Sequence, residues 1–239
     1  MIEPILKELN TKIENIFPKI VAIRRHIHQH PELGNMEFKT SELVQEELKS
    51  YGIEVRKGYA KTGVIGVLKG AKPGPVMALR ADMDALPILE SSGKEWASKV
   101  PGKAHSCGHD GHTAILLCTA RYLAETRRFD GTLNLIFQPA EETLGGARRM
   151  IEDDLFQRFP CDAVYALHNM PGLPVGTFVS QAGAMSASSD LATIRLVGVG
   201  GHGAMPHKAR DPIVAAAELV LALQSIVARN VPASEVGVI

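Results

Sequence analysis

Three apolar runs, each followed within three residues by a carboxylate or a histidine, constrain the fold of this chain more than any other sequence feature. The runs span residues 76–80, 132–138 and 163–167. The first run is continuously apolar, which is typical of a strand buried in the middle of a sheet, and the other two are expected to be strands as well. The chain is therefore expected to form an open α/β sheet, which binds its ligands at the carboxyl ends of its strands.

Carboxylates and a histidine follow these runs. Asp82 and Asp84 come after the first, Glu141 and Glu142 after the second, and His168 after the third. For the Asp pair, turn chemistry explains the positions equally well, because Asp and Pro also end strands. Adjacent glutamates suggest that one binds a metal while the other handles the proton of the attacking water. The alternative for the Glu pair is a solvated surface, which its position at a strand end disfavours.

The segment from His105 to His112 has the composition of a metal site, with three histidines, a cysteine, an aspartate and two glycines that permit a tight turn. Thiolate and imidazole both bind zinc-like ions, so Cys107 and His109 are candidate ligands of one ion. The sequence of residues 113–123 predicts a helix. The positive N-terminus of this helix favours a thiolate at Cys107 and a carboxylate at Asp110. The alternative is a polar loop whose histidines only form hydrogen bonds, but so many ligand types seldom meet by chance.

Two helices are expected before the first buried strand. Apolar residues recur at helical spacing over residues 5–30, where Pro18 predicts a kink or a boundary between two helices. A second helix over residues 37–48 should stop at Gly52, and short strands follow at 53–56 and 63–69. The histidines near the end of the first helix are His26, His28 and His30. Their spacing places them around the helix end, so they are interpreted as capping and surface residues.

Composition argues against several classes of partner. Lys+Arg and Asp+Glu are balanced at 26 each, so no net charge attracts nucleic acid or an anionic membrane. The most apolar helix, residues 213–227, is interrupted by Glu218 and Gln224, which predicts a packed helix and not a membrane span. The N-terminus lacks the pattern of a secretory signal, and three cysteines are too few for a disulfide framework. These features predict a cytoplasmic protein.

Six stretches follow one another across nearly the whole chain: RRHIHQHPELGNMEFKT, LRADMDALP, HSCGHDGHT, FQPAEET, ALHN and GGHGAMPH. Together they resemble the zinc-dependent metallopeptidase and amidohydrolase family that includes hippurate hydrolase, thermostable carboxypeptidases and plant auxin-conjugate amidohydrolases. The resemblance implies a catalytic domain with a mixed central sheet flanked by helices, and a smaller α+β lid or dimerisation domain inserted between its halves. It also implies two divalent metal ions, with zinc expected first and manganese, cobalt or nickel as alternatives.

The resemblance assigns roles to individual residues. The positions that match metal ligands are Cys107, His109, Glu142 and His168. Glu141 matches the general base and acid, and His202 matches a lid histidine that reaches toward the substrate carbonyl, often from a partner subunit. Asp84 matches an acid that supports the ligands, Asp82 stands in place of a ligand histidine, and Asp110 is expected to support the ligands as well.

The same resemblance divides the chain into residues 1–185, the N-terminal part of the catalytic domain, and residues 186–239, the first part of the lid. The lid should contain a strand over residues 191–199, the helix 211–229 and a further strand starting at Val236. The family has another ligand histidine near its C-terminus, beyond the point where this sequence stops. The chain therefore resembles the N-terminal part of a longer enzyme, which would expose apolar surface in isolation.

The expected activity is hydrolysis of the amide bond of N-acyl or N-aroyl amino acids such as hippurate, or of short peptides. The expected partners are these small molecules and further copies of the chain, in a homodimer or higher oligomer formed through the lid, with no nucleic acid or membrane. One alternative is a zinc deaminase, although the Pro-Cys-x-x-Cys motif of that class is absent. A second alternative is an inactive metal-binding or interaction fragment.

Overall fold

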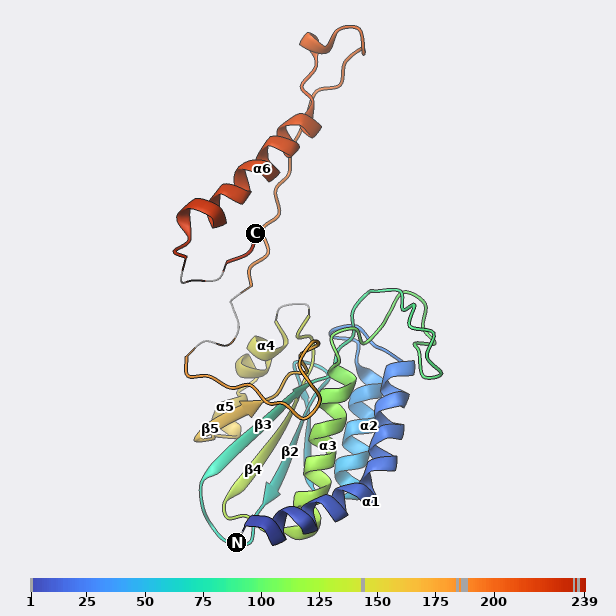
Figure 1. Ribbon diagram of the computed structural model, residues 1–239, viewed down its shortest axis with the longest axis vertical. Coiled ribbons are helices and arrows are strands. Elements are labelled where there is room, and N and C mark those ends of the chain that lie inside the picture. Colours follow the sequence, from blue (N-terminus) through green and yellow to red (C-terminus); the bar gives the residue numbers. More distant parts are fainter. Residues whose placement is uncertain (1, 143–144, 184, 186–188, 234, 236) are drawn as a thin grey trace. The chain divides into compact units, whose positions relative to one another are not determined.

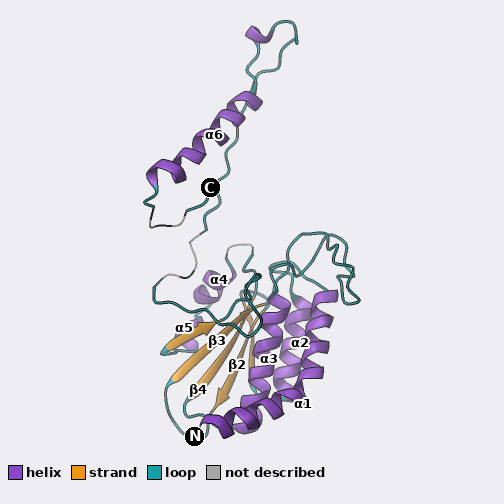
Figure 2. Cartoon of the chain, viewed as in Figure 1, coloured by secondary structure: helices purple, strands orange, loops and turns teal. Residues whose placement is uncertain are grey.

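The computed structural model describes residues 2–142, 145–183, 185, 189–233, 235 and 237–239, which form two compact units, Met1–Gly172 and Leu173–Ile239. The helices of the first unit are α1 (Ile2–Gln29), α2 (Phe38–Ser50), α3 (His109–Thr126), α4 (Gly146–Glu152) and α5 (Leu155–Arg158). Its strands are β1 (Glu54–Tyr59), β2 (Gly63–Lys69), β3 (Val76–Asp82), β4 (Thr132–Gln138) and β5 (Ala163–Ala166). The second unit contains the short 3-10 helix η1 (Pro206–Lys208) and α6 (Pro212–Asn230) (Figures 1 and 2).

The first unit is built on a mixed sheet with the strand order β1-β2-β4-β3-β5. Strand β2 runs antiparallel to both β1 and β4, whereas β3 runs parallel to both β4 and β5. Asp82 at the end of β3 pairs with Gln138 at the end of β4. The segments after these two strands therefore leave the sheet at the same edge, where a site of this fold class is expected.

Helices cover both faces of the sheet, because its central strands alternate apolar side chains between two cores. On β4, Leu135 and Phe137 belong to the core that α1, α2 and α3 complete, and both are fully buried. Ile136 between them belongs to the core formed with Met150 of α4 and Leu155 of α5. Figure 2 shows the three long helices beside the sheet. The result is a layered α/β unit whose central strand is apolar on both faces, as its sequence predicts.

The sequence predictions for this unit match most of its elements. The predicted strands 63–69 and 132–138 coincide with β2 and β4, and Gly52 follows the end of α2 with a φ of 71°. Pro18 lies inside α1, so the segment is one helix and not two. Figure 1 shows that α1 changes direction along its length, as expected for a helix in which proline removes a backbone hydrogen bond.

The second unit departs from two predictions. No strand forms over residues 191–199, where Val199 makes only an isolated bridge with Arg210 through backbone hydrogen bonds of 3.0 and 2.9 Å. A strand requires a continuous hydrogen-bonding partner, and the described part of this unit offers none. Helix α6 begins as predicted, with the Asp211 side chain accepting from the Ile213 amide at 2.8 Å. However, none of its described residues is buried in this unit, so the predicted packed helix is wrong for this chain.

Helix α6 is also long and apolar enough to cross a membrane. This test uses length and composition only, and core helices of soluble proteins pass it too. Helix α6 is the one such helix among the residues that the structure describes. The assignment of residues 1–185 and 186–239 to two domains stays a prediction. Ser186 and Val236, where the lid and its last strand are expected to begin, lie outside the described residues, as does Thr143 in the glutamate motif.

Candidate metal centre

His109 is the residue around which the predicted site residues gather. It begins α3 and is 1% exposed. Its Nδ1 lies 3.2 Å from Asp84 Oδ1, while its Nε2 lies 3.8 Å from Glu142 Oε1 and 4.0 Å from Glu141 Oε2. These Nε2 distances are too long for hydrogen bonds. Burial lowers the pKa of His109, but the Asp84 hydrogen bond and the neighbouring carboxylates raise it by more.

Two atoms of this cluster are buried without any hydrogen-bond partner, His109 Nε2 and Glu142 Oε1. A buried polar atom without a partner costs about 1–3 kcal/mol, so such atoms call for a ligand. Zn²⁺ binds histidine nitrogen and carboxylate oxygen at about 2.0–2.2 Å, which places two ligand atoms on one ion a few ångström apart. The separation of these two atoms fits a shared metal ion.

Cys107 and His168 extend the cluster from two other segments. The Cys107 Sγ lies 3.3 Å from His168 Nε2, and His168 Nδ1 donates to the carbonyl of Asn169 at 2.7 Å. That hydrogen bond leaves Nε2 with its lone pair, as in metal-bound histidines. Burial, followed by the charge of Glu142, raises the pKa of the Cys107 thiol to about 12. A divalent ion at this point would reverse that shift, because it binds the thiolate.

The positions predicted as ligands therefore come together. Three groups have ligand atoms that all lie within 4.8 Å of one another: Cys107, His109 and His168; His109, Glu142 and the predicted base Glu141; and Asp82, His109 and His112. All three groups share His109, so the described residues offer neighbouring positions for metal.

Gly108 explains how these segments approach so closely. It caps the N-terminus of α3 with a φ of 94°, a conformation that residues with a Cβ adopt rarely. A Cβ at this position would lie 2.3 Å from the Asn169 side-chain oxygen. Glycine is therefore required here for both reasons, and it allows the loop that carries Cys107 to lie against the segment that carries His168.

Asp84 holds two of the predicted ligands in place. One of its oxygens contacts His109 Nδ1 at 3.2 Å, and the other accepts the backbone amide of Glu142 at 2.9 Å. A carboxylate that receives the second nitrogen of a ligating histidine fixes both the tautomer and the ring orientation. This geometry suits the supporting acid that the resemblance implies.

Asp82 and His112 also lie beside His109, but hydrogen bonds already occupy them. His112 Nδ1 donates to Asp82 Oδ1 at 2.7 Å, because its Nε2 accepts the Asn169 amide at 3.0 Å. Arg80 donates to the other Asp82 oxygen at 2.7 Å. Burial raises the pKa of Asp82, but the His112 hydrogen bond and the Arg80 charge outweigh it and lower the pKa to about 2. Asp82 Oδ2 nevertheless lies 3.6 Å from His109 Nε2, and Asp82, His109 and His112 form a group that could hold a metal ion.

Asp110 is tied to α1 on the other side of the loop. Its fully buried Oδ2 accepts from Arg24 Nε at 3.1 Å and from His28 Nδ1 at 2.9 Å, while His28 Nε2 lies 3.2 Å from Glu90. His28 is thus no surface histidine, and the sequence interpretation of it is wrong. Its contacts lie 82 and 62 residues away in the chain, so no local spacing could have revealed them.

Glu37 was also missed by the sequence prediction. It is fully buried, accepts the Ala140 amide at 2.8 Å and accepts the Thr62 hydroxyl at 2.7 Å. Burial raises its pKa. Ala140 has a φ of 50°, so Glu37 holds the turn that directs Glu141 from the end of β4.

For His112, the sequence did contain a signal of its position beside His109. The two residues are three positions apart, a spacing that places both on one side of a helix.

His202, the remaining predicted site residue, belongs to the second unit and is exposed. Its Nδ1 accepts the Ala204 amide at 3.2 Å, so the ring is held by its own turn. Its predicted role at the substrate carbonyl stays a prediction.

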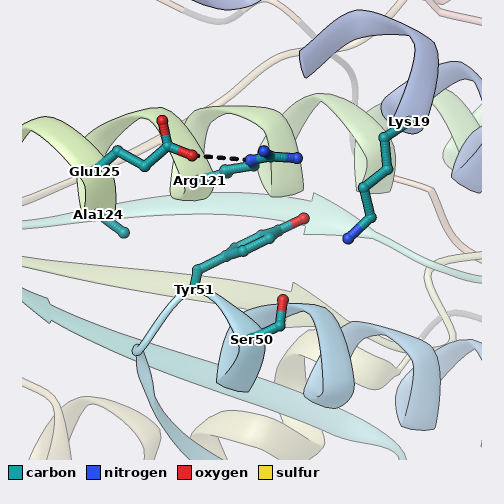
Figure 3. A pocket seen from close by; sticks show the side chains of 6 residues that line it. All are labelled: Lys19, Ser50, Tyr51, Arg121, Ala124 and Glu125. Atoms are coloured by element: carbon teal, nitrogen blue, oxygen red, sulfur yellow. Dashed lines mark hydrogen bonds and ion pairs between the residues drawn. The ribbon is translucent and has the colours of Figure 1, made fainter. Parts of the chain in front are cut away.

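A separate hollow of about 430 Å³ lies where α1, α2 and α3 meet, lined by Lys19, Ser50, Tyr51, Arg121, Ala124 and Glu125 (Figure 3). Arg121 is twelve positions after His109, about 18 Å along an α-helix. Charges in the hollow are paired, since Lys19 contacts Glu47 at 2.6 Å and Arg121 contacts Glu125 at 3.0 Å. No orphaned buried atom was found there among the described residues, unlike at His109.

The cluster around His109 lies in a part of the chain that matches a known protein family. The sequence model of peptidase family M20/M25/M40 matches residues 78–237, a range that includes Asp84, Cys107, His109, Glu142 and His168. The chain belongs to this family. The resemblance predicted from its motifs is thereby confirmed.

Among family members, the chain is 51% identical to hippurate hydrolase of Campylobacter jejuni over 224 residues, covering 91% of this chain and 58% of that protein. It is 46% identical to the N-acetyl-L-cysteine deacetylase of Bacillus subtilis, covering 89% and 51%, and 42% identical to thermostable carboxypeptidase 2 of Saccharolobus solfataricus, covering 95% and 58%. The chain thus spans between half and three-fifths of the length of these relatives.

A solved member of the family has a similar fold. The YXEP protein of Bacillus subtilis, described as a dinuclear metal binding peptidase, superimposes with a TM-score of 0.65 at 42% identity. That match covers 68% of this chain and 46% of the YXEP protein.

Proposed function

We propose that the protein takes part in metal-dependent hydrolysis of the amide bond of N-acyl or N-aroyl amino acids. Relatives at 51%, 46% and 45% identity are named for hippurate, N-acetyl-L-cysteine and IAA-amino acids. These are all amino acids acylated on nitrogen, and their acyl groups differ. The common chemistry is therefore attack of water on an acyl carbon with an amino acid as leaving group.

Two divalent ions would be held by Cys107, His109, Glu142 and His168. The YXEP protein, a relative with a similar fold, is described as a dinuclear metal binding peptidase. The observation that carries this proposal is the buried pair of unpartnered atoms, His109 Nε2 and Glu142 Oε1. Thiolate and imidazole ligands favour zinc, with manganese, cobalt or nickel as alternatives. Bound divalent ions would lower the pKa of water to near 7 and polarise the acyl carbonyl.

Glu141 would carry the proton. Its side chain is 43% exposed, its Oε2 lies 4.0 Å from His109 Nε2, and its carboxylate forms no hydrogen bond with the described residues. A carboxylate in this position can accept a proton from the attacking water and return it to the leaving amine. Glu142 differs, because its backbone amide is held by Asp84 and its Oε1 is buried.

His202 would donate to the oxyanion that develops on the carbonyl oxygen. This role rests on its sequence motif and on the assignment of residues 186–239 to a lid, through which the chain would form a homodimer or higher oligomer. The proposed compartment is the cytoplasm, as the sequence predicts.

The activity is tested with hippurate and N-acetyl amino acids, in a version of the protein extended to the length of its relatives. Glu141→Gln and His202→Ala should each lower turnover, the latter by about 10²-fold, as for loss of other oxyanion donors. If His202 acts across a subunit boundary, mixing the two variants should restore part of the activity. Recovery no greater than the sum of the two variants would refute action between subunits.

A second candidate is that the 239 residues bind metal without turnover. The observation in its favour is that the chain spans 58% of the length of hippurate hydrolase. Robust hippurate hydrolysis by residues 1–239 alone would exclude it.

A further inference from the structure

His26 lies in the last turn of α1, and His30 directly follows the helix, with its amide hydrogen-bonded to the His26 carbonyl at 3.2 Å. Their ring centroids are 4.5 Å apart, and the ring planes are inclined by 35°. Histidines at positions i and i+4 of a helix point to the same side and can bind one metal ion together. We propose that His26 and His30 form a surface site for a borderline divalent cation such as Ni²⁺, Cu²⁺ or Zn²⁺. This site is independent of the proposed function.

The hydrogen bonds of the two rings leave nitrogen atoms available. His30 Nδ1 donates to the backbone carbonyl of His26 at 2.8 Å, so its Nε2 keeps a free lone pair. Metal-bound histidines typically make this kind of hydrogen bond through the other ring nitrogen. The His26 ring forms no hydrogen bond with the described residues, so either of its nitrogens can bind. Two nitrogens on one Zn²⁺ ion at about 2.0–2.1 Å lie roughly 3 Å apart, which neighbouring rings can reach.

The surroundings contain one favourable and one unfavourable charge for a cation. The C-terminal end of a helix carries a partial negative charge, which attracts cations. Burial, and then the charges of His30 and Lys99, lower the pKa of His26 and keep its ring neutral at pH 7, the form that binds metals. Lys99, whose amide donates to the carbonyl of Gln29 at 2.9 Å, also repels a bound cation. Its removal should therefore strengthen binding.

His28 lies between the two positions in sequence but takes no part in the site. Both of its ring nitrogens are engaged, by Asp110 at 2.9 Å and Glu90 at 3.2 Å. His26 is exposed and His30 is half-buried, so solvent ions can reach them, whereas His109 is 1% exposed. An immobilised ion can therefore distinguish the surface pair from the buried centre.

The test is chromatography of the untagged protein on immobilised Ni²⁺, with elution by imidazole. The wild type should be retained, and His26→Gln and His30→Gln should each elute at lower imidazole. The double variant should elute with the single variants, because a chelate is lost when either ligand is removed. His207→Gln, an exposed histidine of η1, should elute with the wild type, and Lys99→Gln should elute later.

Circular dichroism of each variant checks that the fold is retained, as expected for substitutions at a solvent-accessible helix end. Elution of His26→Gln and His30→Gln together with the wild type would overturn the proposal. It would equally be overturned by small additive shifts no larger than that of His207→Gln, since these indicate separate surface histidines and no chelate.

Discussion

The two neighbouring glutamates after β4 differ in their contacts, and this difference predicts different roles. The Glu142 amide is fixed to Asp84 at 2.9 Å, and its Oε1 points toward His109 Nε2 at 3.8 Å. Glu141 is more exposed, with 43% of its side chain accessible against 21% for Glu142. A ligand and a proton carrier in adjacent positions would have this arrangement.

Glu141→Gln should therefore keep its metal, and Glu142→Gln should lose it, because only the latter removes a ligand oxygen. Metal content after dialysis is the measurement, with the wild type as reference. In the version of the protein extended to the length of its relatives, Glu141→Gln should also lower the rate of amide hydrolysis by about 10²–10⁴-fold. Loss of metal from Glu141→Gln with retention in Glu142→Gln would reverse the assignment.

Contacts over long sequence separations explain which site residues the sequence could not reveal. Cys107, His109 and Glu142 were predicted as ligands from residue type and motif, because ligand chemistry is local to the side chain. Glu37 contacts Ala140 across 103 residues, and His28 contacts Asp110 across 82. Such partners follow from the packing of helices on the sheet, which no spacing pattern in one segment contains.

At the scale of elements, α1 and α3 are joined by the contact between His28 and Asp110. Asp110 is fully buried and directly follows His109, so this contact also fixes the start of the helix that carries a predicted ligand. The Asp110 hydrogen bond, opposed by burial, raises the pKa of His28 from its ordinary value. Because the folded state binds the proton more tightly, the resulting stability is complete below the unfolded pKa and is lost as pH rises through the folded pKa.

His28→Ala should therefore destabilise the protein by about 1–3 kcal/mol, because it removes one partner of a buried carboxylate. The loss should be larger near pH 6 than at about pH 8.5, where the imidazole is neutral in both forms. Urea unfolding at the two pH values measures it, with the exposed His26→Ala as the matched control. Equal losses for the two variants, or no dependence on pH, would contradict the role of His28.

Helices and strands were predicted well where the segment itself contains the apolar or capping pattern of the element. They were predicted badly where the element depends on hydrogen bonds to another strand. Strands β2 and β4 were located because their apolar runs suit a sheet interior. Helix α6 was located because Asp211 caps it and apolar residues continue to its end. Residues 191–199 have the β-branched composition of a strand, but composition supplies no hydrogen-bonding partner. Only the three-dimensional structure could show that the partner is missing among the described residues.

At the scale of the whole molecule, α6 presents apolar side chains that the described part of its unit does not cover. Ile213 is 75% exposed and Leu221 is 72% exposed. Contiguous apolar surface of this kind favours association. We expect residues 1–239 to self-associate in solution in proportion to concentration.

Leu221→Lys and Ile213→Lys should reduce this association, as measured by light scattering over a range of concentrations. Glu218→Lys is the matched control on the same helix, because it replaces one charged side chain with another. A monodisperse monomer for the wild type, or equal association for all variants, would show that the apolar surface of α6 does not drive assembly.

The metal centre around His109 is tested most directly by elemental analysis of the dialysed protein. The account predicts divalent metal in the wild type and much less in Cys107→Ala and His109→Ala. His26→Gln should match the wild type, because a pair of surface histidines should lose its ion on dialysis. Equal metal content in the wild type, Cys107→Ala and His109→Ala would contradict the account.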